Sequence, residues 1–93
     1  EIIYKNLVLI QLRTDFVQKD IVDVSFRGPF VIERPKVLKN PITQQYVMYI
    51  HLDDANYTSP NVGVSISSTP IGPYKFVHAY KPDGYVIHTT FIF

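Results

Sequence analysis

The side chains best suited to chemistry in this 93-residue chain stand in two polar stretches: Glu33-Arg34, directly before Pro35, and the run from His51 to Tyr57. An ionised carboxylate such as Glu33 accepts charge-assisted hydrogen bonds, which are about twice as strong as neutral ones. Taken alone, a glutamate before proline is usually a solvated charge at the end of a strand. We expect Arg34 to be its ionic partner or a brace for the backbone. We expect His51 to form hydrogen bonds at a strand end, with ligand contact as the alternative.

The acidic pair Asp53-Asp54 could act as an acid–base pair or, together with Asn56, bind calcium. Neighbouring residues of an extended chain point to opposite sides, which argues against a proton shared by the two carboxyl groups. The cluster also lacks the ligand spacing of a recognised calcium loop. We therefore expect Asp53 and Asp54 to organise the loop that follows them, through turns in which a carboxylate accepts backbone N–H groups.

Composition excludes several classes of function. Nine basic and eight acidic residues give a net charge of +1, which leaves no electrostatic footprint for nucleic acid or an anionic membrane. Cysteine is absent, which excludes disulfides and thiolate chemistry, and the three histidines are too widely separated to share a metal ion. The apolar run at residues 2–12 is too short and too interrupted to span a membrane. We expect no cofactor and no metal site.

The elements that must position these residues are predicted to be strands. Many β-branched and aromatic residues, seven prolines and the lack of a long helical period favour strands at residues 36–39, 45–52, 62–67 and 74–80. A residue before proline is pushed to extended geometry, so Arg34 is expected to be extended. Short connections between the four strands predict an antiparallel meander. Such meanders, repeated around an axis, build a β-propeller.

Alternation within the predicted strands indicates which side chains are buried together. In residues 45–52 the even-numbered side chains share one face and the odd-numbered ones the other, and both faces are apolar enough to lie between neighbours. In residues 62–67 an apolar face of Val62, Val64 and Ile66 alternates with a face of glycine and serine. We expect the small face to let another backbone or sheet approach.

Four segments carry a joint pattern: E-R-P-K-V at 33–37, Y-V-M-Y-I-H-L-D-D-A-N-Y at 46–57, V-G-V-S-I-S at 62–67 and P-I-G-P-Y-K-F at 70–76. Together they resemble glycoside hydrolase family 43, and within it the exo-β-1,3-galactanases and their plant relatives that act on arabinogalactan. The resemblance is close over residues 32–84 and weaker over residues 20–31. The joint pattern is specific, whereas no single segment is.

The resemblance implies an all-β fold: a five-bladed β-propeller, of which this chain would be a fragment with about one complete four-stranded antiparallel blade and parts of its neighbours. Residues 1–31 would end a preceding blade, residues 32–80 would form one four-stranded blade, and residues 81–93 would be the divergent first strand of the next. Apolar runs at both ends of the chain also favour a piece of a larger protein, with the remaining blades missing here.

The resemblance also implies a hydrolase that cleaves β-1,3-galactan or arabinogalactan side chains, with an oligo- or polysaccharide as its substrate. Glu33 stands where the family's carboxylate binds the terminal galactose hydroxyls, and Tyr57 stands near the sugar. Arg34, His51 and Asp54 are weaker candidates for substrate binding. No catalytic residue is expected within the chain, because the family's general acid lies further along. Secretion or Golgi residence follows from the family alone.

One segment departs from the family pattern. The family's supporting aspartate lies in a Ser-Arg-Asp-Met segment, where this chain reads Ile-His-Thr-Thr at 87–90 with Thr89 in the aspartate place. Either the enzyme is inactive or the sequence after Gly84 is shifted or wrongly spliced, and the abrupt end of the resemblance favours the second explanation. The alternative function is a non-catalytic propeller or carbohydrate-binding domain. A structural β-domain without a ligand is the third hypothesis.

Overall fold

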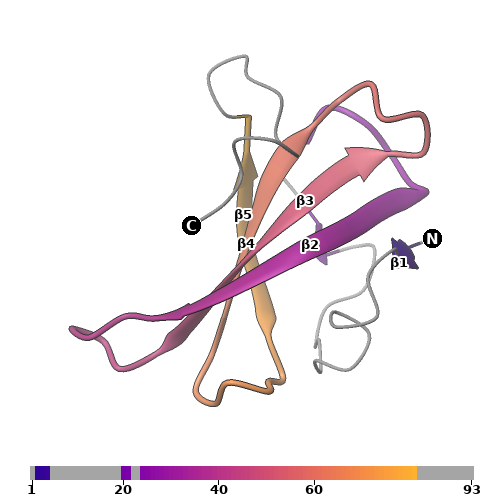
Figure 1. Ribbon diagram of the computed structural model, residues 1–93. Helices are drawn as coiled ribbons and strands as arrows, with labels where there is room; N and C mark the ends of the chain where they lie inside the picture. The colour runs from indigo at the N-terminus through magenta and orange to yellow at the C-terminus, as the bar shows by residue number, and fades with distance from the viewer. Residues whose placement is uncertain (1, 5–19, 22–23, 82–93) are drawn as a thin grey trace.

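The computed structural model describes residues 2–4, 20–21 and 24–81, and every element in this part of the chain is a strand. The strands are β1 (Ile2–Tyr4), β2 (Phe30–Lys39), β3 (Tyr46–Asp54), β4 (Asn61–Ser67) and β5 (Lys75–Tyr80). They form one sheet in the order β1-β2-β3-β4-β5, as Figure 1 shows. Strands β2 to β5 pair antiparallel, which confirms the predicted all-β meander. Strand β1 pairs parallel with β2, a pairing that the sequence did not predict.

Strand β2 begins six residues earlier than predicted, because a β-bulge lets it pass through Pro35. Glu33 pairs with His51 and Lys36 pairs with Tyr49, so two residues of β2 lie opposite Ile50 alone. Proline has no N–H to give to the ladder, and a bulge leaves such a residue unpaired without ending the strand.

The expectation that Arg34 is extended was wrong. Its φ angle is 56°, in the left-handed region, because the first extra residue of one type of bulge adopts that conformation. The bulge also shifts the alternation of side chains along β2. Ile32 before it and Val37 after it both pack against the main core, although they are an odd number of positions apart.

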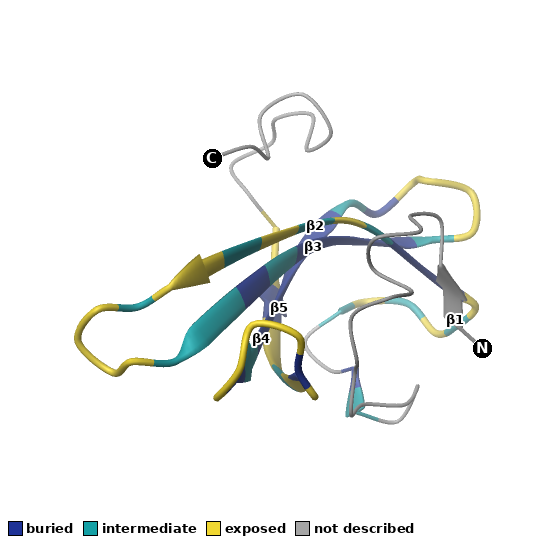
Figure 2. Ribbon diagram, turned by 60° about the horizontal axis from the view of Figure 1, so that its bottom comes forward, coloured by how far each residue is buried: buried dark blue, intermediate teal, exposed yellow. Residues whose placement is uncertain are grey.

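The main core lies on one face of the sheet, centred on β3. Met48, Ile50 and Leu52 have no exposed surface, and Figure 2 shows the buried middle of the sheet against the exposed hairpin tips. The core cluster is made of Ile21, Phe30, Ile32, Met48, Ile50, Leu52, Tyr74 and Ala79. The opposite face carries a smaller cluster of Val62 and Val64 with Val47 and Tyr49. The predicted division of β3 into two apolar faces is therefore confirmed.

The glycine and serine face of β4 is turned towards the main core. A Cβ atom added at Gly63 would lie 2.8 Å from Cγ1 of Ile50, so no larger residue fits there without movement. Ser65 on the same face is 1% exposed. The close neighbour on this face is the side chain of Ile50, from the adjacent strand of the same sheet, and the approach of another backbone or sheet stays a prediction.

Several predictions fall outside the described residues. These are most of the apolar run at residues 2–12, and residues 82–93 with Thr89. The assignment of residues 1–31, 32–80 and 81–93 to three successive blades stays a prediction. Within the described part of the chain, no helix is long and apolar enough to cross a membrane.

Candidate functional site

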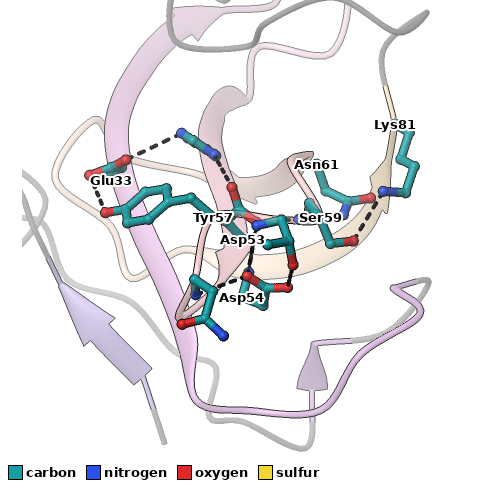
Figure 3. A network of polar contacts seen from close by, with 10 residues as sticks. Glu33, Asp53, Asp54, Tyr57, Ser59, Asn61 and Lys81 are labelled. Carbon is teal, nitrogen blue, oxygen red and sulfur yellow. Dashed lines mark hydrogen bonds and ion pairs between the residues drawn. The ribbon is translucent and has the colours of Figure 1, made fainter.

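Glu33 and Tyr57, which lie 24 positions apart in the sequence, meet at one end of the sheet (Figure 3). Glu33 lies on β2 just before the bulge, and Tyr57 lies on the loop between β3 and β4. The phenol hydroxyl of Tyr57 donates a hydrogen bond of 3.4 Å to Oε2 of Glu33. The other carboxylate oxygen, Oε1, lies 3.3 Å from Nδ1 of His51, the residue that pairs with Glu33 across the sheet. The structure thus brings together two residues that the sequence resemblance singled out.

His51 is held between two carboxylates. Its Nε2 lies 2.9 Å from Oδ2 of Asp53, two positions along the same strand and therefore on the same face. His51 is 2% exposed and Asp53 is 1% exposed. Oδ1 of Asp53 accepts the backbone N–H groups of Asp54, at 2.8 Å, and of Ser59, at 2.9 Å. Asp53 therefore ties the loop between β3 and β4 to the imidazole ring.

Asp54 shapes the same loop from the other side. Its Oδ1 accepts the backbone N–H groups of Asn56, at 3.0 Å, and Thr58, at 2.9 Å, and its Oδ2 accepts the hydroxyl of Thr58. The hydroxyl bond from Thr58, followed by the N–H bond from the same residue, lowers the pKa of Asp54 below its ordinary value. The predicted role of Asp53 and Asp54 in organising this loop is confirmed by these contacts.

The loop presents Tyr57 in an unusual backbone conformation. The φ angle of Tyr57 is 58°, and its N–H donates to the carbonyl of Asp54 at 3.1 Å. Bulky side chains seldom adopt positive φ, and such residues gather at ligand sites where the surrounding structure enforces them. The Tyr57 side chain is 46% exposed and its ring lies edge-on to that of His51, with 6.0 Å between centroids. Partial burial, and then the negative charge of Glu33, raise the pKa of Tyr57 above its ordinary value.

This arrangement can bind a neutral polyhydroxylated molecule. One carboxylate accepts hydrogen bonds from hydroxyl groups, and a half-exposed phenol beside it offers an apolar face and a polar tip. Among the described residues, no group of three or more histidine, aspartate or glutamate side chains could hold a metal ion.

The weaker candidates Arg34 and His51 differ in their exposure and in their partners. Arg34 is exposed, and the two ion pairs found within the described ranges join His51 to Glu33 and to Asp53. The predicted pairing of Glu33 with Arg34 was therefore wrong. The bulge turns the backbone at Arg34 and explains the change of partner. His51 forms a hydrogen bond, as expected, through Nε2 with Asp53, but it lies within β3 rather than at the end of the strand. At the far side of the loop, Lys81 donates to Oγ of Ser59 at 3.0 Å, a contact that the sequence did not reveal.

The sequence analysis did not predict the buried hydrogen bond between His51 and Asp53. Its signal was present, because residues two apart on a strand share a face and a histidine beside an aspartate at that spacing can pair with it. The pairing of His51 with Glu33 depends on the register of β2 against β3. That register could not be read from the sequence, because the bulge shifts it.

Comparison with known proteins gives matches among solved structures. No family model matches the chain, and no curated protein matches it significantly. An exo-β-1,3-galactanase from Phanerochaete chrysosporium, solved with galactose, is 41% identical, covers 69% of this chain and 15% of its own, and superimposes with a TM-score of 0.59. A variant of the same enzyme was solved with β-1,3-galactotriose.

Two further structures extend the range of matches. A GH43 β-1,3-galactosidase is 27% identical over 76% of this chain and 16% of its own, with a TM-score of 0.63. Another GH43 β-1,3-galactosidase, solved with galactodeoxynojirimycin, is 34% identical over 57% of this chain and 16% of its own, with a TM-score of 0.53. The chain thus spans 15–16% of the length of these three relatives.

Proposed function

Because this chain is an exo-β-1,3-galactanase-like segment of glycoside hydrolase family 43, we propose that the complete protein containing it hydrolyses β-1,3-galactan or arabinogalactan side chains. The antiparallel sheet of β2 to β5 is a blade of the family's propeller. In this proposal the segment supplies residues that bind the terminal galactose. The catalytic acid comes from a part of the protein that the segment does not contain.

The observation that carries the proposal is the meeting of Glu33 and Tyr57. Oε2 of Glu33 and the hydroxyl of Tyr57 lie 3.4 Å apart, so hydroxyl groups of one sugar ring can reach both. The Glu33 side chain is 18% exposed, which leaves the carboxylate accessible from one side. A carboxylate accepts two hydroxyl groups at once, and the phenol can lie against the apolar face of the ring.

The other carboxylates near this pair are unsuited to acid–base work. Asp53 is 1% exposed, and its two oxygens are already bonded to His51 and to two backbone N–H groups. Asp54 is bonded to the loop that it caps. Inverting glycosidases need two carboxyl groups about 6.5–9.5 Å apart on either side of the bond to be cleaved. The segment therefore fits a binding role, and the acid is expected elsewhere in the protein.

Substitution of Glu33 by glutamine, made in the complete protein, tests the proposal. The change keeps the shape of the side chain but removes the charge, and a hydrogen bond to a charged group contributes about 1.5–3 kcal/mol, so galactan hydrolysis should fall by a factor of about 10–100. Lys75→Gln, an exposed change of charge on β5, is the matched control and should leave the rate unchanged. Wild-type activity in Glu33→Gln would remove Glu33 from the site.

A second candidate, a non-catalytic carbohydrate-binding propeller, is favoured by the sequence at 87–90. There Thr89 stands where the family has an aspartate. In that case the complete protein binds galactose or β-1,3-galactobiose, and Glu33→Gln weakens binding, but β-1,3-galactan is not cleaved. Measuring both binding and hydrolysis on the unmodified protein separates the two functions.

A further inference from the structure

The imidazole ring of His51 lies between the ligand-facing carboxylate and a buried one. Its Nε2 contacts Oδ2 of Asp53 at 2.9 Å, and its Nδ1 faces Oε1 of Glu33 at 3.3 Å. The ring comes from β3, Glu33 comes from β2, and Tyr57 from the following loop lies edge-on to the ring. The imidazole thus connects a rigid loop anchor to the carboxylate proposed to bind sugar.

The Asp53 side of this connection is fixed. Asp53 is 1% exposed and accepts two backbone N–H groups besides its contact with the ring, so its carboxylate has little freedom to turn. Nδ1 on the other side is buried and has no hydrogen bond of good direction within the described ranges. The polar atom that it faces is Oε1 of Glu33, at the distance of an ion pair.

The character of the contact between Nδ1 of His51 and Oε1 of Glu33 depends on where the protons lie. Oδ1 of Asp53 accepts two backbone N–H groups, and Oδ2 lies 2.9 Å from Nε2. An ionised Asp53 can only accept, so Nε2 is the donor when Asp53 is ionised. A ring with a single proton would then turn a lone pair on Nδ1 towards Oε1 of Glu33. The contact at 3.3 Å is attractive when a second proton lies on Nδ1 or on Oε1.

We propose that His51 is a positioning residue for Glu33, an inference that rests on the proposed function. The ring holds Oε1 in place, so that Oε2 and the hydroxyl of Tyr57 are turned towards the sugar. His51 itself does not touch the ligand, because it is 2% exposed. Its predicted minority role in sugar contact is thereby replaced by an indirect one, in which the affinity for galactose depends on the Nδ1 side of the ring.

Two isosteric substitutions separate the two sides of the ring. The amide nitrogen of asparagine occupies about the place of Nδ1, so His51→Asn keeps a donor towards Glu33. The amide nitrogen of glutamine corresponds to Nε2, so His51→Gln keeps the contact with Asp53 and loses the one with Glu33. Galactose affinity, measured by calorimetry on the complete protein, should fall about tenfold in His51→Gln and clearly less in His51→Asn. Thermal unfolding of both variants is measured alongside as the control for folding.

The outcomes distinguish this inference from the proposed function. If Glu33→Gln binds galactose like the unmodified protein, the proposed function fails. If Glu33→Gln is weakened but His51→Gln and His51→Asn bind equally well, or if affinity simply follows thermal stability, the positioning role of His51 is overturned.

A measurement on the wild-type histidine covers the case in which a His51 variant fails to fold. In protein labelled with ¹⁵N at histidine, the Nδ1 signal of His51 should move when Glu33 is changed to glutamine, because the charge facing that atom is lost. The Nε2 signal, facing Asp53, should move less. An Nδ1 signal that stays in place would overturn the proposal.

Discussion

Replacing Gly63 by alanine tests how tightly β3 and β4 pack around the core. A Cβ at position 63 would lie 2.8 Å from Cγ1 and 3.1 Å from Cδ1 of Ile50, and 3.5 Å from Cε1 of Phe76. Carbon atoms pack best about 3.5–4.0 Å apart, so Cγ1 has to retreat by about 0.7 Å. Ile50 has no exposed surface and a stiff χ1, so the movement is passed to the backbone of β3.

The expected size of the effect follows from two opposing terms. Overpacking of a core costs about 1–3 kcal/mol. Gly63 has no positive φ, so alanine suits its backbone and contributes about 0.4–1 kcal/mol by restricting the unfolded chain. The free energy of unfolding should therefore fall by about 1.3 kcal/mol, the middle of a range of about 0–2.6 kcal/mol. Urea unfolding of the complete protein, followed by circular dichroism, measures this difference.

A matched control and a double-mutant cycle identify the cause. Val77→Ile adds one carbon at an exposed position of β5 and should change the free energy of unfolding by less than about 0.5 kcal/mol. In a background with Ile50→Ala the atoms that meet the new Cβ are absent, so Gly63→Ala should cost less there, by about 0.5–3 kcal/mol. A Gly63→Ala variant more stable than the wild type, or an equal cost in both backgrounds, would refute the reasoning.

Two further predictions concern pH. Asp54 has a lowered pKa in the folded protein, so the stability that it contributes is fully present above its ordinary value of 3.8 and is lost as the pH falls through the lower folded value. Asp54→Asn should remove that part of the acid dependence of the unfolding free energy. Tyr57 has a raised pKa, so its contribution is fully present below its ordinary value of 10.0 and is lost as the pH rises through the higher folded value. In a spectrophotometric titration, Tyr57 should ionise at a higher pH than an ordinary tyrosine. In Glu33→Gln it should ionise at a lower pH than in the wild type.

Each of these predictions has a result that contradicts it. If Asp54→Asn and the wild type lose stability in parallel between neutral pH and acid, the bonds from Thr58 and Asn56 do not stabilise the ionised form of Asp54. Tyr57→Phe identifies the phenolate signal that belongs to position 57. If that signal titrates at the same pH with glutamate or glutamine at position 33, the two side chains do not interact in solution.

The arrangement of β3, β4 and β5 could be predicted from the sequence because alternation and turn residues both act locally. The predicted strands at residues 45–52, 62–67 and 74–80 lie within two residues of the observed ones. Strand β2 was predicted to be too short because Pro35 was taken as its beginning, and a bulge depends on the partner strand rather than on the sequence around it. The parallel pairing of β1 with β2 joins distant segments, for which local patterns carry no signal.

The sequence predicted which residues belong to the candidate site better than it predicted the contacts between them. Glu33 and Tyr57 were singled out by resemblance to a family, and the structure brings them together at 3.4 Å. The link through His51 was not foreseen, because it depends on which residue of β3 faces Glu33. The partner expected for Glu33, Arg34, was chosen from its adjacent position. Adjacent side chains on a strand point apart, and the bulge turns this pair further.

The bulge in β2 has a consequence for how proteins of this kind can diverge. Because two residues of β2 lie opposite Ile50, the two halves of the strand keep separate registers against β3. The hairpin between β2 and β3 lies entirely on the far side of that break. A shift of one residue in the register at Glu33 would turn its side chain to the opposite side of the sheet. A change of length in that hairpin therefore falls on the half of β2 that lies beyond the bulge from Glu33.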